Sequence, residues 1–288
     1  MDSIANPSAT KELLDRFGFS FKKRFGQNFL IDENVVRKIV RLSGVTKNDT
    51  VLEIGPGIGT MTQILSEEAG GVIAVEIDSK LMEVLDYTLQ DRKNVKVINA
   101  DILKCSLREM SAKYAGGGRF RVVANLPYYI TTPIIMGLLE ENAEQDKSLI
   151  ESITVMIQKE VADRINAKPG TKDYGALSLA IEYYTQPSIL MNVPASVFMP
   201  RPNVDSAVIG LEILEKPPVK VKDEKKLFTL IRAAFAQRRK IFVNSVSGVM
   251  SIEKDMIREA LSFTGHDENI RGEMLTLEEF AIISDLIP

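Results

Sequence analysis

Polar residues stand at the ends of successive β-rich runs in the first half of the chain. The first run leads into a glycine-rich stretch that extends from Glu53 to Gly59, and the second run ends at Glu76. Asp101 and Asn125 follow the third and fourth runs at similar intervals. Open parallel sheets bind ligands beyond the carboxyl ends of their strands. We therefore expect these residues to share one rim of a sheet and to form a binding site there.

The residue types along this rim fit a nucleoside that carries a positive charge. Gly55, Gly57 and Gly59 allow the backbone to approach a ligand where a Cβ atom would clash. Glu76 is placed to accept hydrogen bonds from two ribose hydroxyls, and Asp101 can accept one from an adenine amino group. The acidic residue before the first glycine disfavours phosphates, and the spacing differs from the dinucleotide fingerprint. Taken singly, these residues also fit turns and helix caps. Together they predict a site for S-adenosylmethionine, with S-adenosylhomocysteine as the product.

The fourth run ends in the tetrapeptide Asn125-Leu126-Pro127-Tyr128. An exocyclic base amine is a poor nucleophile because its lone pair is delocalised into the ring. The amide oxygen of Asn125 and the carbonyl oxygen of Leu126 can accept its two hydrogens and favour a localised lone pair. Pro127 stiffens the turn, and Tyr128 offers a ring on which a base can stack. In isolation this stretch also fits a simple turn. At this strand end it predicts methyl transfer to a base amine by positioning and polarisation.

The composition excludes several other kinds of chemistry. The 288 residues include one cysteine, Cys105, and one histidine, His266, so disulfides and cysteine- or histidine-based catalysis and metal sites are not expected. No apolar run reaches the roughly 18 residues of a membrane span, and the first residues lack a secretion signal. We expect a cytoplasmic protein without a metal. Nothing in the sequence demands an oligomer, so we expect a monomer.

Apolar runs alternate with segments of helical periodicity through the first half of the chain. The expected strands are 51–54, 72–77, 95–98, 122–124, 153–157 and 206–214. The expected helices are 35–42, 61–69, 81–89 and 177–184. Continuous apolar strands that alternate with helices predict an α/β fold. We expect a Rossmann-like methyltransferase domain with a mixed, mostly parallel sheet and helices on both of its faces.

The sequence also predicts how the chain divides into domains. The methyltransferase domain is expected over 1–214, with an N-terminal cofactor and RNA motif at 20–31. Residues 215–222 contain consecutive prolines and are expected to form a linker. Only helical patterns follow, so 223–288 are expected to form a small all-α domain that binds RNA.

The ordered set of motifs resembles the ribosomal RNA adenine N6-dimethyltransferases of the bacterial KsgA (RsmA) type. The resemblance covers nearly the whole chain. It is carried by KKRFGQNFL at 22–30, EIGPGIGTMT at 53–62, VEID at 75–78, ADIL at 100–103, ANLPYYITTPI at 124–134, VFMPRPNVDSAV at 197–208, FAQRRKIFVNS at 235–245 and RGEMLTLEEF at 271–280. The glycine loop is generic to methyltransferases and N-L-P-Y is specific to amine methylation, whereas the full ordered set is specific to this family.

The resemblance implies further site residues. Beside the glycines and acidic residues, it implies cofactor contacts from Gln27, Asn28, Leu30, Ile102 and Asn125. Phe198, close to Pro200, resembles the family's second aromatic residue, which flanks the target base. A rigid, packed loop is the alternative explanation for Phe198 and Pro200.

Basic residues are concentrated in a chain whose net charge is −3. Residues 219–245 hold eight basic side chains against two acidic ones. We expect RNA contacts from Lys22, Lys23, Arg24, Lys225, Arg232, Arg238, Arg239 and Lys240. Lys225, Arg232 and Arg239 are spaced seven apart, which places them on one stripe of a continuous helix. The alternative is that these charges are only solvated surface.

The resemblance implies transfer of two methyl groups to each of two adjacent adenines in a hairpin loop near the 3′ end of 16S ribosomal RNA. The partner would be the maturing 30S subunit, and the protein would take part in its biogenesis. Two alternatives remain open. One is an Erm-type enzyme that methylates 23S RNA and confers macrolide resistance; the other is an assembly or transcription factor that docks on RNA independently of methyl transfer.

Overall fold

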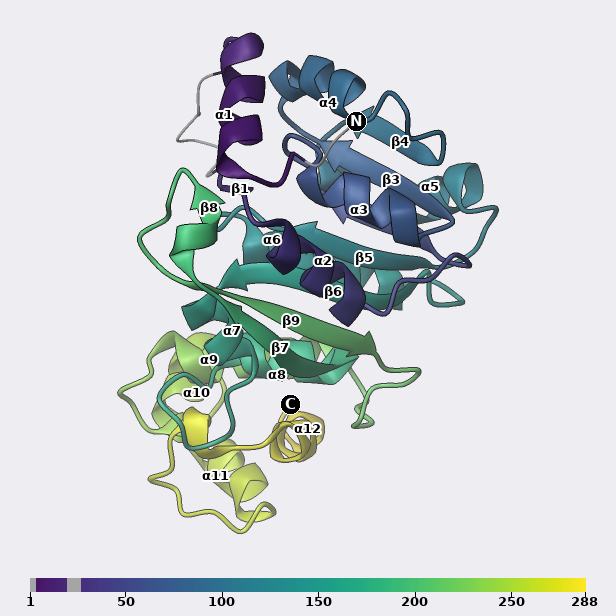
Figure 1. Cartoon of the computed structure of the whole chain (residues 1–288). Helices are drawn as coiled ribbons and strands as arrows, with labels where there is room; N and C mark the ends of the chain where they lie inside the picture. The colour runs from purple at the N-terminus through teal and green to yellow at the C-terminus, as the bar shows by residue number, and fades with distance from the viewer. Residues whose placement is uncertain (1–3, 20–26) are drawn as a thin grey trace. The chain divides into compact units, whose positions relative to one another are not determined.

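The computed structural model describes residues 4–19 and 27–288, so the predicted RNA contacts Lys22, Lys23 and Arg24 lie outside the described residues. The chain folds as two compact units (Figure 1). The first comprises Met1–Ala162 and Ser188–Ile213, and the second comprises Asp163–Pro187 and Leu214–Pro288.

A seven-stranded sheet forms the centre of the first unit. Its strands are β2 (Thr50–Ile54), β3 (Gly71–Glu76), β4 (Val95–Asn99), β5 (Phe120–Asn125), β6 (Ile150–Gln158), β7 (Thr185–Val193) and β9 (Ser206–Ile213). Their order across the sheet is β4-β3-β2-β5-β6-β9-β7. The strands from β4 to β6 are parallel to their neighbours, and β9 is antiparallel to β6. The expected mixed, mostly parallel sheet is confirmed.

Helices cover both faces of this sheet. The helices of the first unit are α1 (Pro7–Arg16), α2 (Glu33–Leu42), α3 (Thr60–Glu68), α4 (Met82–Thr88), α5 (Leu107–Tyr114) and α6 (Thr131–Ala143), and α7 (Lys159–Ile165) contains the boundary between the two units. Figure 1 shows α2 and α3 in front of the sheet and α5 and α6 behind it. Ile39 of α2 and Leu65 of α3 pack on Val51 and Val123, and all four side chains are buried. The alternation of apolar strands and helices therefore encloses a core on each side of the sheet.

Local signals determine where helices begin and end. Asp32 caps α2, because its side chain accepts hydrogen bonds from the backbone amides of Asn34 and Val35. Gly44 follows the same helix with a φ of +66°, a conformation that favours glycine. The two residues thus define the ends of the helix. Among the described helices, none is long and apolar enough to cross a membrane.

A short antiparallel pair joins distant parts of the first unit. In it, β1 (Phe29–Leu30) pairs with β8 (Phe198–Met199), so that Leu30 lies opposite Phe198. The first unit also contains the 3-10 turns η2 (Ser79–Leu81), η3 (Ile102–Lys104) and η4 (Ala195–Val197). Residues 29–30, a described part of the N-terminal motif, are thereby held against the segment that precedes β9.

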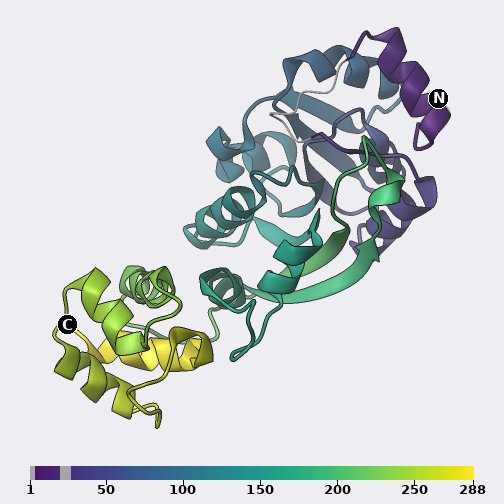
Figure 2. The same cartoon turned by 90° about the vertical axis from the view of Figure 1, so that its left-hand side faces the viewer.

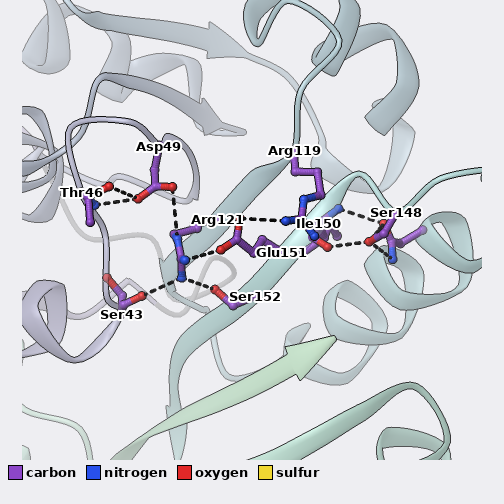
Figure 3. Close-up of polar contacts among 10 residues, drawn as sticks. Ser43, Thr46, Asp49, Arg119, Arg121, Ser148, Ile150, Glu151 and Ser152 are labelled. Carbon is purple, nitrogen blue, oxygen red and sulfur yellow. Dashed lines mark hydrogen bonds and ion pairs between the residues drawn. The ribbon is translucent and has the colours of Figure 1, made fainter. Parts of the chain in front are cut away.

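Arg121 links the amino ends of β5 and β6 to the loop before β2 (Figure 3). Its guanidinium group donates to the carbonyl oxygen of Ser43 and the hydroxyl of Ser152, and it forms an ion pair with Glu151. Its Nε atom lies 3.3 Å from Asp49 Oδ1. Burial opposes ionisation of Asp49, but hydrogen bonds from Thr46 and the Arg121 charge hold its pKa below the usual range. This network braces the edge of the sheet opposite the strand ends that carry polar residues.

Helices make up the second unit. They are α8 (Ala176–Tyr184), α9 (Glu224–Ala236), α10 (Phe242–Met250), α11 (Lys254–Ser262) and α12 (Leu277–Leu286), with the 3-10 turn η5 (Gly272–Met274). Figure 2 shows the last four helices gathered around a common centre. Tyr174 and Leu179 share its core with Leu227, Phe242 and Phe280. Residues 163–187, which the sequence assigns to the first domain, therefore belong to this unit, because their apolar side chains complete its core.

We expect Arg121→Ala to lower the free energy of unfolding by about 3 kcal/mol, because it leaves the largely buried Asp49 without its cation. Denaturant unfolding at neutral pH measures this change. Arg119→Ala is the matched control, since the Arg119 side chain is 55% exposed and pairs with the same Glu151. It should cost about 0.5 kcal/mol or less. Equal losses in the two variants would contradict a bracing role for Arg121.

Candidate active site

A pocket with about 1010 Å³ of space, partly open to solvent, lies at the carboxyl ends of the parallel strands. Strands β2, β3 and β5 each end at its wall, together with the turn that follows β4. The predicted site residues that line it are Gln27, Asn28, Leu30, Gly55, Gly57, Glu76, Asp101, Ile102, Asn125, Leu126, Pro127 and Tyr128. The predicted rim therefore exists as one cavity. The individual roles of these residues remain predictions.

Two glycines of the loop after β2 have different surroundings. Gly57 has a φ of +61°, and a Cβ atom there would come within 2.9 Å of the Phe29 ring. Gly57 is also part of the pocket wall, as predicted. A Cβ atom on Gly59 would come within 2.9 Å of Thr88 Oγ1, and Gly59 is not part of the wall. Packing against α4 therefore explains Gly59, whereas close approach to a ligand is possible at Gly57.

Glu76, the last residue of β3, is 4% exposed. Its Oε1 atom accepts a hydrogen bond from the Asp78 amide, and its Oε2 atom accepts one from the Gly57 amide. Burial raises the pKa of Glu76 to about 7, although these amides oppose the shift. The carboxylate is thus held in one orientation, and each oxygen can accept a further hydrogen bond from a ligand hydroxyl.

Glu53, the penultimate residue of β2, lies deeper in the pocket. It is 2% exposed, and its Oε2 atom has no hydrogen-bond partner among the described residues. Burial raises the pKa of Glu53 to about 8, and the nearby Glu76 carboxylate adds to the shift. The Thr62 hydroxyl opposes it but is not aligned for a hydrogen bond. A carboxyl group in this position favours a ligand with a positive charge.

Asp101 acts as a helix cap as well as a wall residue. Its Oδ1 atom accepts a hydrogen bond from the Leu103 amide at the start of η3. Its Oδ2 atom lies 3.9 Å from the exposed Lys104 ammonium group. One carboxylate oxygen is therefore committed to the backbone, and the other can accept a hydrogen bond from a ligand.

The orientation of the Asn125 amide follows from a single hydrogen bond. Asn125 Nδ2 donates to the carbonyl oxygen of Asn28 at a distance of 3.0 Å. A carbonyl oxygen can only accept, so the NH₂ end of the amide must face Asn28. The Oδ1 atom is left as the end that can accept a hydrogen bond from a substrate.

The residues after Asn125 form a rigid turn. The Leu126 amide donates to the carbonyl oxygen of Met156, and the Pro127 carbonyl oxygen accepts from the Ile130 amide. The hydroxyl of Tyr128 lies 2.8 Å from Ser206 Oγ. Hydrogen bonds thus hold both ends of the turn. Among the described residues, no backbone amide donates to the Leu126 carbonyl oxygen, which keeps it available for a substrate amine.

Phe198 is buried in the structure. It is 3% exposed, pairs with Leu30 and shares a core cluster with Val208. Phe198 and the exposed Pro200 are not part of the pocket wall. In the structure Phe198 packs in the core with Leu30, as the packed-loop alternative describes, and its role beside a target base stays a prediction.

The wall residues that were not predicted include Phe29, Ile77 and Tyr129. Phe29 is buried against the glycine loop, and Ile77 is an apolar residue with 46% exposure directly after Glu76. Tyr129 is 56% exposed. Two sequence signals were available. Ile77 is an apolar residue that follows the acid at a strand end, and Tyr129 is a second tyrosine directly after N-L-P-Y.

The predicted basic stripe is wrong in one respect. Helix α9 ends at Ala236, so Arg239 is not on the same helix as Lys225 and Arg232. Arg238 donates to the backbone carbonyl oxygens of Lys172 and Tyr174, which explains its position without RNA. The remaining predicted contacts of this unit are exposed: Lys225, Arg232, Arg239 and Lys240.

Comparisons with known proteins agree with this architecture. The family model described as ribosomal RNA adenine dimethylase matches residues 18–287. A ribosomal RNA small subunit methyltransferase A from Lachnoclostridium phytofermentans is 54% identical and aligns over 100% of this chain and 98% of its own. The protein of the same name from Clostridioides difficile is 47% identical, with 100% of this chain and 98% of its own covered.

Solved structures share the fold. A dimethyladenosine transferase from Plasmodium falciparum has a TM-score of 0.70 at 23% identity, and covers 88% of this chain and 95% of its own. The 23S rRNA methyltransferase ErmE has a TM-score of 0.67 at 25% identity, and covers 90% of this chain and 99% of its own.

The mostly parallel sheet with a pocket at its carboxyl edge, together with the relatives named as methyltransferases, defines an S-adenosylmethionine-dependent methyltransferase. The match over nearly the full length narrows this class further. The chain belongs to the ribosomal RNA adenine dimethylase family.

The pKa values of Glu53 and Glu76 predict how stability changes with pH. Both are raised from 4.5 in the folded protein, to about 8 and about 7. Between pH 4.5 and 8 the folded protein retains protons that the unfolded chain releases, so a rise in pH favours unfolding. We expect the melting temperature of the ligand-free protein to fall by roughly 5 °C between pH 5.5 and 8.5 because of these groups.

Melting curves of Glu53→Gln and Glu76→Gln across the same pH range measure this contribution. Both variants should show a flatter dependence than the wild type. Glu68→Gln, a change at an exposed residue of α3, should leave the dependence as it is. An unchanged slope in both pocket variants would show that the carboxyl groups are ionised in the folded protein.

Proposed function

We propose that this protein transfers methyl groups from S-adenosylmethionine to N6 of two adjacent adenines near the 3′ end of small-subunit ribosomal RNA, forming dimethyladenines. The observation that carries the proposal is the fixed orientation of the Asn125 amide at the rim of a carboxylate-lined pocket. The choice of small-subunit ribosomal RNA as the substrate rests on the relatives named as small subunit methyltransferases. The proposal includes action on the maturing 30S subunit in the cytoplasm and a role in its biogenesis.

The pocket residues fit S-adenosylmethionine. Gly57 leaves space where a Cβ atom would collide, and Glu76 presents fixed oxygens to ribose hydroxyls. The unpartnered Glu53 oxygen suits a cation and disfavours phosphate. Asp101 and the apolar Ile77 and Ile102 would hold the adenine end. Together they support a nucleoside cofactor without phosphates.

The turn after β5 would activate the target amine. When bound, S-adenosylmethionine supplies a methyl group on a positively charged sulfur. Asn125 Oδ1 and the Leu126 carbonyl oxygen accept the two amine hydrogens and localise the nitrogen lone pair. Tyr128, anchored to Ser206, offers its ring to the adenine. The methylated nitrogen is acidic, so water can remove its proton and no strong protein base is required.

Exposed cations in the second unit support docking on RNA. Arg232 lies on the outer face of α9, and Arg239 and Lys240 lie in the turn that follows. None of these three has an ion-pair partner among the described residues. Their charge is therefore available to phosphates.

We expect Asn125→Ala to reduce methyl transfer by about a thousandfold, because it removes one acceptor that polarises the amine. Labelled-methyl incorporation into unmethylated small subunits measures the loss. The dissociation constant for S-adenosylmethionine should remain within about threefold of the wild type, since Glu76 and the glycine loop are intact. Undiminished turnover would exclude the polarising role.

The same assay on large subunits tests the Erm-type alternative. We expect label in the small subunit alone, with dimethyladenine as the modified base. Label in 23S RNA would instead support the alternative that ErmE represents among the solved structures.

For RNA docking, the double variant Arg232→Ala/Arg239→Ala should bind unmethylated small subunits about tenfold more weakly, because two phosphate contacts are lost. Filter binding measures the affinity. Lys222→Ala is the control, since its ammonium group donates to the Asp285 carbonyl oxygen. An equal loss of affinity in the control would refute the assignment of docking to the two arginines.

A further inference from the structure

The ionisable side chains that line the described pocket wall are all acidic. Among the described residues that line it, three are carboxylates and none is a lysine, arginine or histidine. Both oxygens of Glu76 accept backbone hydrogen bonds, and Asp101 is 28% exposed at its side chain and caps η3. Glu53 combines nearly complete burial with an oxygen that lacks a partner. When Glu53 ionises, a compensating charge can therefore come only from the ligand or from outside the described wall residues.

The surroundings of Glu53 contain no cation within the described part of the chain. Its neighbours across the sheet are Ala74 on β3 and Val123 on β5. Helix α3 contributes the hydroxyls of Thr60 and Thr62, which also lack hydrogen-bond partners. The ionisable group that acts on Glu53 is Glu76, whose charge repels it. The described residues thus provide no positive charge that would stabilise the ionised form of Glu53.

The cofactor and its product differ in one feature that such a group can sense. S-adenosylmethionine carries a positive charge on sulfur, and S-adenosylhomocysteine has a neutral thioether. They share the adenosine and amino-acid portions. We propose that the buried Glu53 carboxyl group discriminates between the two by charge and thereby favours replacement of the product by fresh cofactor. This inference rests on the proposed function, because it takes S-adenosylmethionine as the ligand.

Proton uptake and release follow from this arrangement. With S-adenosylhomocysteine in the pocket, whose sulfur is neutral, burial and Glu76 keep Glu53 protonated near neutral pH. The additional sulfonium charge of S-adenosylmethionine favours the carboxylate, so its binding releases a proton that binding of S-adenosylhomocysteine retains. The preference for the cofactor should therefore increase as the pH rises toward about 8.

Such discrimination matters for an enzyme that must act repeatedly on one substrate. Two methyl groups on each of two adenines require the product to leave the pocket several times. A pocket that recognised only the shared portions would hold the product nearly as well as the cofactor, since one methyl group contributes little binding energy. Charge provides the larger difference.

Calorimetric titration of the RNA-free protein tests the inference. The ligands are S-adenosylmethionine, S-adenosylhomocysteine and sinefungin, an analogue with an ammonium group in place of the sulfonium. The wild type should bind both cationic ligands about tenfold more tightly than the product. In Glu53→Gln this ratio should approach one, mainly through weaker binding of the cationic ligands. Glu68→Gln should keep the wild-type ratio.

A pH series from 6 to 8.5 completes the test. The preference of the wild type should rise with pH, whereas that of Glu53→Gln should stay flat, and titration of the ligands themselves cancels between the two proteins. Equal weakening of all three ligands in Glu53→Gln, or a pH-independent preference in the wild type, would overturn the inference. The wild-type series decides the matter even if the variant does not fold. Because no RNA is present, failure of methyl transfer to ribosomal RNA is a separate result.

Discussion

The hydrogen bond from Asn125 to the Asn28 carbonyl oxygen is the contact on which the site depends. It determines which end of the amide faces the pocket, and it joins the end of β5 to the N-terminal motif. Two described residues of this motif, Phe29 and Leu30, pair in turn with β8. A hydrogen bond between residues far apart in the sequence thus sets the acceptor geometry that an amine substrate would meet.

Charged groups in the pocket and at the opposite edge of the sheet differ in whether the protein itself provides partners of opposite charge. The pocket is lined by Glu53, Glu76 and Asp101, and burial makes ionisation of the first two costly. At the opposite edge of the sheet, Arg121 is compensated by Asp49 and its other partners. The charge of Arg121, which stabilises the fold, is therefore paired within the protein. The carboxyl groups of the pocket have no basic partner among the described wall residues, so a bound ligand can supply the positive charge.

The strand ends could be predicted because continuous apolar strands leave their polar terminal residues on one rim. Strand β7 was missed because it is a largely exposed edge strand that contains Pro187, and so lacks an apolar run. Phe198 was placed beside the substrate, but pairing with Leu30 buries it. The predicted stripe of basic residues on α9 likewise included Arg239. The helix ends at Ala236, and nothing in the sequence marks that end. Tertiary contacts decided each of these cases.

The lysines that contact the C-terminal helix affect how strongly RNA binding should depend on salt concentration. Lys222 and Lys226 donate to the carbonyl oxygens of Asp285 and Ile287 at the end of α12, and Arg238 is committed to backbone carbonyls in the same unit. These cations displace few condensed counterions when the protein meets a nucleic acid. Association should therefore weaken less steeply with added salt than a tally of basic residues in this region implies.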